Sequence, residues 1–557
     1  MSPLVCMPFA VGHGQEGLCL EVGMGPHHII LDCGLANLQA LKTARNDRGA
    51  ADLLFCSHAH SDHAAGILDF HRFFPGVPIY GSEVTAQLLS LNWPDLVDGV
   101  DLCQALPWHT PLQVAEDLTI QIWPAGHLPG AACALFTYRS PERAYTVFYT
   151  GDFFMSNSRL VDGLPLEVLR GLKPDVLIVE GSVGTACHSH RRQQENQLAT
   201  TIYDLWQQGR SLLLPVPTLG LGQELVMLLR SHHHFTGKDI TVWVDNRVAA
   251  GCDAYLELLP HLPASVQNFA RHQPLFWDER ILPRIRRLTS SNQLDESHPC
   301  IIIADQGGDP SAYCRTLKHP WSILLPEALA ADLALTVLSH PGLDSDLPLD
   351  WLQSLAPELE LGRVQLETYS LATHSDRIGT TQLIHNLRPQ HVVLIHGHPN
   401  HLADLAALEE LQTRYHLHLP TTGKLLEFPL GDRFLQPAPP DPVFEVEITA
   451  VDDCLLLQLP EAMIRDRRSH LLTGSGLVQA RWQGDELVLK GVSQRDVLRS
   501  MAWSPRQASS QNCRDCQYLR QGRCRSHQSP LYGREVSPEG YCQAFEPSLE
   551  AKDRQAL

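Results

Sequence analysis

The sequence lacks any long apolar run and is poor in basic residues. No stretch approaches the roughly 18 consecutive apolar residues of a membrane-spanning helix, and the first residues do not resemble a secretion signal. We therefore expect no membrane contact and a cytoplasmic protein. Lysine and arginine total 43 against 62 aspartates and glutamates, a formal net charge of −19. This balance argues against indiscriminate binding to a polyanion but does not exclude a local phosphate site.

A histidine-rich segment near residue 60 carries the strongest chemical signal. The apolar run Leu53–Phe55 predicts a strand, and an HxHxDH loop follows it closely. Side chains of an extended chain alternate, so His58 and His60 point the same way and can bind one metal ion. The turn that follows brings Asp62 and His63 toward a second ion. Imidazole and carboxylate ligands at this density favour zinc over manganese or iron.

Two metal ions need more ligands than one loop supplies, and further candidates stand where apolar runs end. They are Asp32, His127, Asp152 and His396. Strand-to-loop junctions are places where a rigid scaffold presents functional side chains. A single histidine in such a place is more often structural, but four residues of these types, in chain order, predict a dinuclear metal site.

In this order, the residues resemble the motifs of the metallo-β-lactamase superfamily. Asp32 resembles the first motif, the HxHxDH loop the second, His127 the third and Asp152 the fourth. Three later residues resemble motifs A, B and C of the β-CASP branch, namely Glu180, His374 and His396. That branch includes ribonuclease J, the polyadenylation-factor endonuclease and some DNA-repair nucleases. The resemblance covers roughly residues 1–435.

The resemblance implies an α/β protein, an αββα sandwich with an inserted β-CASP α/β domain. Alternating strand patterns add a small β-rich module, and closely spaced cysteines add a cysteine-rich tail. The metallo-β-lactamase domain is expected at residues 1–205 and 364–435, with the β-CASP domain at 206–363. A proline linker is expected at 436–442, the β-rich module at 443–500 and the cysteine-rich tail at 501–557.

The resemblance also implies hydrolysis of a phosphodiester bond in single-stranded RNA, with two zinc ions activating water for attack at phosphorus. One zinc ion is expected at His58, His60 and His127, and the second at Asp62, His63 and His396, with Asp152 bridging them. Catalytic roles are expected for Asp62, His374, Glu180 and Asp32. Among them, His374 would donate a proton to the leaving oxygen, Glu180 would hold it, and Asp32 would orient a ligand histidine.

Several positions depart from the family pattern. Leu221 stands where an arginine is usual, His398 where a glutamate is usual, and residues 304–308 replace the familiar Thr-Ser-Gly-Met stretch. The expected ligands are intact while the inserted domain differs, so the substrate is open. Two alternatives therefore stand, a dinuclear zinc hydrolase of small esters and a catalytically weak or inactive protein of the same fold that binds RNA or a partner. The sequence also allows a homo-oligomer.

A cluster of cysteines near the C-terminal end is the second chemical signal. Fifteen cysteines in a chain without a secretion signal are expected to be reduced thiols or metal ligands. Four of them fall close together, namely Cys513, Cys516, Cys524 and Cys542. Four thiolates can hold a tetrahedral zinc ion or a [4Fe–4S] cluster, and the spacing favours neither. Surface thiols without a ligand are the third interpretation.

Other basic residues are not assigned to the metal site. The run of histidines at residues 232–234 is expected in a solvated loop, and Arg159 is expected at the surface. His188 and Arg191 resemble a family motif and serve either the site or the contact between domains.

Overall fold

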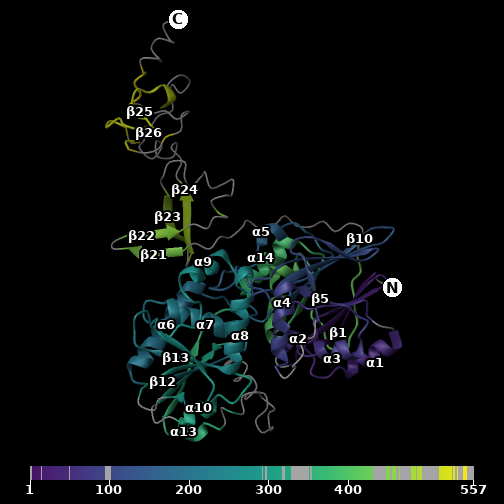
Figure 1. Cartoon of the computed structure of the whole chain (residues 1–557). Coiled ribbons are helices and arrows are strands. Elements are labelled where there is room, and N and C mark those ends of the chain that lie inside the picture. Colours follow the sequence, from purple (N-terminus) through teal and green to yellow (C-terminus); the bar gives the residue numbers. More distant parts are fainter. Residues whose placement is uncertain are drawn as a thin grey trace. The chain divides into compact units, whose positions relative to one another are not determined.

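The computed structural model describes most of residues 3–430 and parts of the remainder (Figure 1). Within residues 3–430 the gaps are 14–15, 49–50, 95–101, 291–292, 295–297, 317–319, 328–350 and 352–353. Beyond residue 446 the described residues are 447–451, 454–458, 463, 478–483, 486–491, 513–529, 531–533, 536 and 544–548. The chain divides into two compact units, Met1–Pro440 and Asp441–Leu557, and each is described by itself.

Two seven-stranded sheets form one part of the first unit. The first sheet has the order β20-β1-β2-β3-β4-β5-β6, with β1 (Leu4–Val11), β2 (Leu18–Met24), β3 (His27–Leu31), β4 (Leu53–Phe55), β5 (Ile79–Ser82), β6 (Gln104–Leu106) and β20 (Leu426–Glu427). The second has the order β19-β18-β11-β10-β9-β8-β7, with β7 (Leu112–Ala115), β8 (Leu118–Pro124), β9 (Ala132–Arg139), β10 (Ala144–Tyr149), β11 (Val176–Glu180), β18 (His391–Ile395) and β19 (His416–His418).

The two sheets face each other across an apolar core. Phe55 of β4 meets Phe136 of β9 and Tyr149 of β10 edge to face, with ring centroids 5.7 and 6.4 Å apart. Successive residues of a strand point to opposite faces, so Leu53 joins this core while Leu54 packs in a second cluster with the helices. Strand β11 alternates in the same way between the two clusters. The arrangement confirms the predicted αββα sandwich.

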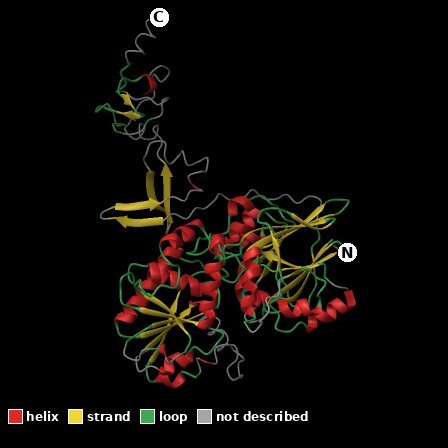
Figure 2. Cartoon of the chain, viewed as in Figure 1, coloured by secondary structure: helices red, strands yellow, loops and turns green. Residues whose placement is uncertain are grey.

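Helices cover the outer faces of this sandwich (Figure 2). They are α1 (Gln39–Arg48), α2 (Ser61–Ala64), α3 (Ile67–Phe73), α4 (Glu83–Leu88), α5 (Leu166–Leu169), α14 (Arg377–Leu387), α15 (Pro399–Ala406) and α16 (Glu409–Gln412). Buried apolar residues at helical spacing, such as Ile67 and Phe70 of α3, supply the contact with the sheets.

A third, six-stranded sheet forms the rest of the first unit. Its order is β14-β13-β15-β12-β16-β17, with β12 (Ser211–Val216), β13 (Thr241–Asp245), β14 (Arg284–Leu288), β15 (Ile301–Asp305), β16 (Trp321–Pro326) and β17 (Val364–Tyr369). Its described strand pairings are parallel, and β12 and β15 are buried throughout. The helices of this part are α6 (Arg191–Gln207), α7 (Leu221–Ser231), α8 (Asn246–Glu257), α9 (Ala264–His272), α10 (Ser311–Thr316) and α13 (Ala356–Glu360). This is the inserted α/β domain that the sequence predicted.

Strand β17 belongs to the third sheet and not, as expected, to the sandwich. We expected the chain to rejoin the sandwich at residue 364, but Val364–Tyr369 pairs with β16 at the edge of the third sheet. The chain re-enters the second sheet only at β18. The pattern of a short strand does not reveal its neighbour, because strand pairing is not local. The remaining domain limits stay predictions.

The second unit contains short antiparallel hairpins among its described residues. β21 (Glu447–Val451) pairs with β22 (Cys454–Gln458), and β23 (Val478–Gln483) pairs with β24 (Glu486–Gly491). They fall within the predicted β-rich module. β25 (Leu519–Arg520) and β26 (Arg523–Cys524) form a third, shorter hairpin, while the proline linker at residues 436–442 lies outside the described residues. Among the described helices of both units, none combines the length and apolar character that crossing a membrane requires.

Candidate metal centre

The carboxyl ends of parallel strands bring the expected site residues together. In the first sheet β3 and β4 are parallel, with Asp32 directly after β3 and the HxHxDH loop after β4. In the second sheet β10, β11 and β18 are parallel neighbours, which places Asp152, Glu180 and His396 at one edge. Asp32 and His396 have φ angles of 54° and 52°, a left-handed conformation that Asp and His adopt more readily than most residues. Both turn the chain sharply at a strand end.

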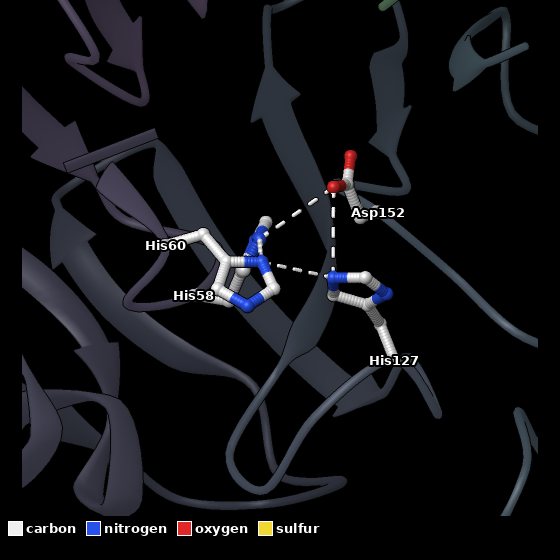
Figure 3. Close-up of side chains that lie close together, drawn as sticks. All are labelled: His58, His60, His127 and Asp152. Carbon is white, nitrogen blue, oxygen red and sulfur yellow. Dashed lines mark hydrogen bonds and ion pairs between the residues drawn. The ribbon is translucent and has the colours of Figure 1, made fainter. Parts of the chain in front are cut away.

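Four side chains form the first set of possible ligands, His58, His60, His127 and Asp152 (Figure 3). Their ligand atoms all lie within 4.8 Å of one another. His60 Nδ1 is 3.1 Å from Nε2 of His58 and 3.0 Å from Nε2 of His127. Asp152 Oδ2 lies 3.6 Å from Nε2 of His58 and 3.7 Å from Nε2 of His127. Three imidazole nitrogens and one carboxylate oxygen match the donors of a zinc site.

A second set of possible ligands shares Asp152 with the first. Asp62, His63, Asp152 and His396 also place ligand atoms within 4.8 Å of one another. Asp152 presents its other oxygen, Oδ1, to this set, 3.3 Å from His63 Nε2. Asp62 Oδ2 lies 3.8 Å from His63 Nε2 and 3.2 Å from His396 Nε2. One carboxylate therefore faces both sets, as a ligand that bridges two ions must.

Burial makes this concentration of polar groups costly without a cation. His58 and His63 are fully buried, and Asp152 is 2% exposed. His63 Nε2 and Asp152 Oδ1 have no hydrogen-bond partner among the described residues. Burial, together with the neighbouring imidazoles, lowers the pKa of His58 and of His127, so both rings are neutral and can offer an electron pair. The residues present therefore fit divalent metal ions.

Hydrogen bonds to the far ring nitrogens determine which nitrogen of a histidine faces the site. His63 donates from Nδ1 to Oδ2 of the fully buried Asp32 at 2.7 Å. His127 donates from Nδ1 to the carbonyl of Thr373 at 2.8 Å. Contacts of this kind orient metal ligands and raise their basicity. The structure thus brings Asp32 to His63, one of the possible ligands, and its orienting role stays a prediction.

One possible ligand is held by the inserted domain. His60 Nε2 donates to the carbonyl of Leu219 at 3.2 Å, in the loop between β12 and α7. The next residue, Gly220, has a φ of +89°, which side chains rarely adopt, and a Cβ atom there would lie in van der Waals contact with the His60 ring, 3.6 Å from Nε2. The loop therefore turns beside the metal centre, and a backbone carbonyl from the inserted domain helps to orient a histidine of the sandwich.

Glu180 joins His374 to the second ligand set. Its Oε1 accepts a hydrogen bond from His374 Nδ1 at 3.1 Å, and its Oε2 accepts one from Ser182 Oγ at 2.6 Å. Ser182 Oγ in turn accepts from His396 Nδ1 at 2.9 Å. Burial alone would lower the pKa of His374, but the charge and hydrogen bond of Glu180 raise it to about 9. Sequence analysis missed Ser182, although it lies only two residues after Glu180.

Two family models match the chain. A model described as "Beta-lactamase superfamily domain" matches residues 27–199, and one described as "Zn-dependent metallo-hydrolase RNA specificity domain" matches residues 363–420. The chain is also 44% identical over 550 residues to the uncharacterized protein sll0514 of Synechocystis sp., a match that covers 97% of this chain and 96% of that protein.

More distant relatives carry functional names. The chain is 25% identical over 430 residues to cleavage and polyadenylation specificity factor 73 of Drosophila melanogaster, covering 71% of this chain and 60% of that protein. It is 24% identical over 421 residues to an RNase J-like protein of Methanocaldococcus jannaschii, covering 71% of this chain and 93% of that protein. The chain belongs to the β-CASP branch of the metallo-β-lactamase superfamily.

The departures from the usual β-CASP pattern lie outside the two ligand sets. Leu221, where an arginine is usual, opens α7 and is 8% exposed within the apolar cluster of the helices. His398, where a glutamate is usual, caps the N-terminus of α15, and its Nδ1 accepts from the backbone N–H of Asn400 at 3.2 Å. Leu221 therefore packs in the core and His398 begins a helix, while the third departure, residues 304–308, starts at the end of β15.

A buried charge network supports the β-CASP insertion beside the site. Arg191 contacts Glu195 and Glu224 at 3.3 Å each and also donates to the carbonyl of Ala372. Arg159 pairs with Glu195 at 2.7 Å, and its backbone N–H donates to Glu224 at 2.9 Å. The side chain of Arg159 is still 27% exposed, so it lies partly at the surface while its guanidinium pairs with the acid that Arg191 also contacts. Arg191 joins segments of the two domains.

The histidine run at residues 232–234 is only partly solvated. His232 is 6% exposed, so the expected solvated loop was wrong for this residue. The ligand atoms of the three histidines do lie within 4.8 Å of one another. However, His232 Nε2 faces Asn196 Oδ1 at 3.2 Å and its Nδ1 accepts from the backbone N–H of His234 at 3.3 Å. Both of its nitrogens are thus engaged by protein groups.

Three of the four tail cysteines lie among the described residues of the second unit. Cys513 and Cys524 are 7% exposed and share a small apolar cluster. Cys516 follows Cys513 in a tight turn, with its backbone N–H donating to the Cys513 carbonyl at 3.1 Å. Cys542 lies outside the described residues. A zinc ion or [4Fe–4S] cluster in the tail therefore stays a prediction.

Proposed function

We propose that this chain is a metal-dependent phosphodiester hydrolase that cuts single-stranded RNA. The observation that carries the proposal is Asp152, whose two oxygens face two separate ligand sets beside His374. The matched model described as an RNA specificity domain supports RNA as the substrate class, as do relatives named for polyadenylation and for RNase J. The acidic chain would then bind RNA through this site and a few local contacts, not through a general positive surface.

The two ligand sets would each hold one divalent ion. His58, His60 and His127 would hold the first, Asp62, His63 and His396 the second, and Asp152 would be shared. Zinc suits these donors best. When bound, two such ions supply an activated water and offset negative charge at phosphorus. The fully buried His58 and His63 would keep the ligands of both sets in fixed positions.

His374 would provide the proton that the leaving oxygen needs. With a pKa of about 9 its imidazole is protonated at neutral pH. Its Nδ1 is held by Glu180, and its side chain is 23% exposed, so a substrate can reach the ring from the solvent side. Glu180, which is 1% exposed, acts here as a positioning residue that holds the ring and stabilises its charge.

The same carboxylate would also position a metal ligand. Through Ser182 Oγ, Glu180 reaches Nδ1 of His396 and leaves Nε2 of that ring facing Asp62. Proton donation and metal binding would therefore depend on one buried glutamate. Loss of Glu180 should disturb both.

A substrate panel tests the proposal. The zinc-loaded chain is incubated with labelled single-stranded RNA, with DNA of the same sequence and with small esters, while elemental analysis counts bound zinc. We expect RNA to be cut, cutting to stop with a chelator, and zinc to restore it. His233→Ala, at an exposed histidine outside the site, is the matched control and should retain full activity. If the chain hydrolyses the small esters but not RNA, the small-ester alternative would replace the proposal. A zinc-loaded chain that binds RNA but hydrolyses nothing would replace it with the binding-protein alternative.

A further inference from the structure

A cavity of about 580 Å³ lies in the inserted domain, at the open edge of the third sheet. Its edge strand is β14, which among the described strands pairs with β13 alone. Trp243 of β13, Trp277 of the loop before β14, and Arg286 and Arg287 of β14 line the cavity. None of them belongs to the two metal ligand sets. The cavity is therefore a separate feature of the domain whose sequence departs most from the family pattern.

Each tryptophan in this cavity carries an arginine beside its ring. Trp243 and Arg286 are register partners on adjacent parallel strands, with the guanidinium carbon 5.9 Å from the indole centroid. The guanidinium carbon of Arg287 lies 4.4 Å from the ring of Trp277. Aromatic faces and planar guanidinium groups are the surfaces on which the unpaired bases of single-stranded nucleic acids stack. Arg286 and Arg287 follow one another on β14 and therefore point to opposite faces of the sheet, so the two pairs flank the edge strand and each offers a planar surface of its own to a flat heteroaromatic ring.

The charges of the cavity favour a base over a phosphate group. Arg286 pairs with Glu279 at 2.9 Å, and Arg287 pairs with Asp253 at 2.6 Å. Each guanidinium is therefore matched by a protein carboxylate, which leaves little excess positive charge to attract the backbone. The same ion pairs restrain the guanidinium planes beside the indoles. A neutral, planar group gains most from such a site.

A side-chain amide at the cavity is held in place by backbone groups. Gln293, which lines the cavity, accepts through Oε1 from the backbone N–H groups of Thr289 at 2.7 Å and Ser290 at 3.2 Å, which leaves its amide N–H groups as the donor end of the side chain. Nucleobase edges carry carbonyl and ring-nitrogen acceptors, which such donors can bind.

We propose that this cavity binds a base of single-stranded RNA at a subsite separate from the metal centre. The choice of RNA rests on the proposed function, whereas the stacking of a planar base rests on the cavity itself. A free nucleotide offers the same planar ring, so the test must separate the two sources. The subsite would add affinity for the strand without taking part in bond cleavage.

Binding and crosslinking test this subsite on the zinc-loaded full chain, with phosphorothioate-linked RNA to slow cutting. RNA carrying 5-iodouridine is irradiated, and we expect the crosslinked peptide to contain Trp243 or Trp277. By fluorescence anisotropy, Trp277→Ala and Arg286→Ala should each weaken RNA binding by about tenfold, within the range that one stacked base contributes. Trp277→Phe keeps an aromatic face and should retain most of the affinity.

The matched control is Arg284→Ala. Arg284 lies on the same strand, its side chain is 32% exposed and paired with Asp239, and it does not line the cavity. This variant should bind RNA as the unchanged chain does, and thermal unfolding should show that all variants are folded. Equal RNA binding by the unchanged chain, Trp277→Ala and Arg286→Ala would overturn the proposal. If adenosine monophosphate binds through Trp277 and RNA does not, the ligand of the cavity is a free nucleotide and not a base of an RNA strand.

The two proposals fail in distinguishable ways. A chain that cuts RNA but binds it independently of Trp277 and Arg286 would refute the subsite and leave the hydrolase proposal in place. A chain that crosslinks RNA at the cavity yet cuts none when loaded with zinc would refute the hydrolase proposal and support the subsite.

Discussion

Charged side chains and aromatic rings gather at two places in the first unit, the carboxyl edge of the sandwich and the β14 edge of the third sheet. The two places differ in how deeply these side chains are buried. At the first, Asp152 and His58 are buried and come from separate strand ends. At the second, the side chains of Arg286 and Arg287 are 37% and 44% exposed and are paired with nearby acids. A buried charge without a partner strongly destabilises the folded state, whereas a solvated ion pair contributes little to stability.

This difference in burial predicts which of the two edges tolerates amino-acid substitutions. A substitution at the sandwich edge removes a partner from several groups at once, because Asp152 serves both ligand sets. A substitution on β14 alters one exposed pair and leaves the strand in place. Chemistry is thus expected to depend on the sandwich edge, while substrate preference can be adjusted at the β14 edge. Four predictions test this division.

The largest effect is expected for Asp152→Asn. The amide keeps the size of the side chain but removes the charge that faces both ligand sets. We expect RNA hydrolysis to fall below detection, beyond the roughly 10²–10⁴-fold that loss of a general acid or base costs. Elemental analysis should show less than the metal content of the unchanged chain. Full turnover with full metal content would refute the shared-ligand arrangement.

The next largest effect is expected for His374→Ala. Loss of the proton donor should slow turnover by about 10²–10⁴-fold with bound metal unchanged. The pKa of His374 is raised to about 9, so the ring is protonated below that pH and loses its proton as the pH rises through it. The unchanged chain should therefore lose activity above about pH 9, and the variant should not show this alkaline decline. The same decline in both proteins would exclude His374 as the donor.

Much of the fold could be predicted from the sequence, because local patterns determine it. The apolar run at β4 and the buried runs of the third sheet indicate strands, and the HxHxDH spacing predicts the loop that follows β4. Pairing is harder, since β17 exposes residues on both faces and its sequence does not identify β16 as its neighbour. Edge strands carry the weakest pattern because little of them is buried.

The candidate site divides in the same way. Its ionisable residues could be found because imidazole and carboxylate side chains at strand ends are an uncommon combination. The carbonyl of Leu219 that orients His60 could not be found, since any residue type offers a carbonyl. Ser182 was missed for a related reason, because serine is common and only its place between Glu180 and His396 distinguishes it.

A third prediction concerns the buried network beside the metal centre. In Arg191→Ala, Glu195 would keep Arg159 as its partner, whereas Glu224, whose side chain is 7% exposed, would keep only uncharged hydrogen-bond donors. Breaking a buried ion pair in this way costs about 3–5 kcal/mol in the free energy of unfolding. Urea denaturation would measure the loss. A change below about 1 kcal/mol, the value of an exposed pair, would mean that water replaces the arginine there.

The smallest effect is expected for Arg287→Ala at the β14 edge. Its guanidinium is 44% exposed and its partner Asp253 is 38% exposed, so water can solvate the acid once the arginine is gone. The free energy of unfolding should change by no more than about 1 kcal/mol, and salt should reduce even that difference. Hydrolysis of a dinucleotide at the metal centre should be unaffected, because Arg287 belongs to neither ligand set. If Arg287→Ala instead destabilises the chain as much as Arg191→Ala does, the two edges are held by the same kind of buried pair. In that case substitutions on β14 would be as destabilising as substitutions beside the metal centre. The proposed difference between the two edges in their tolerance of substitution would then be wrong.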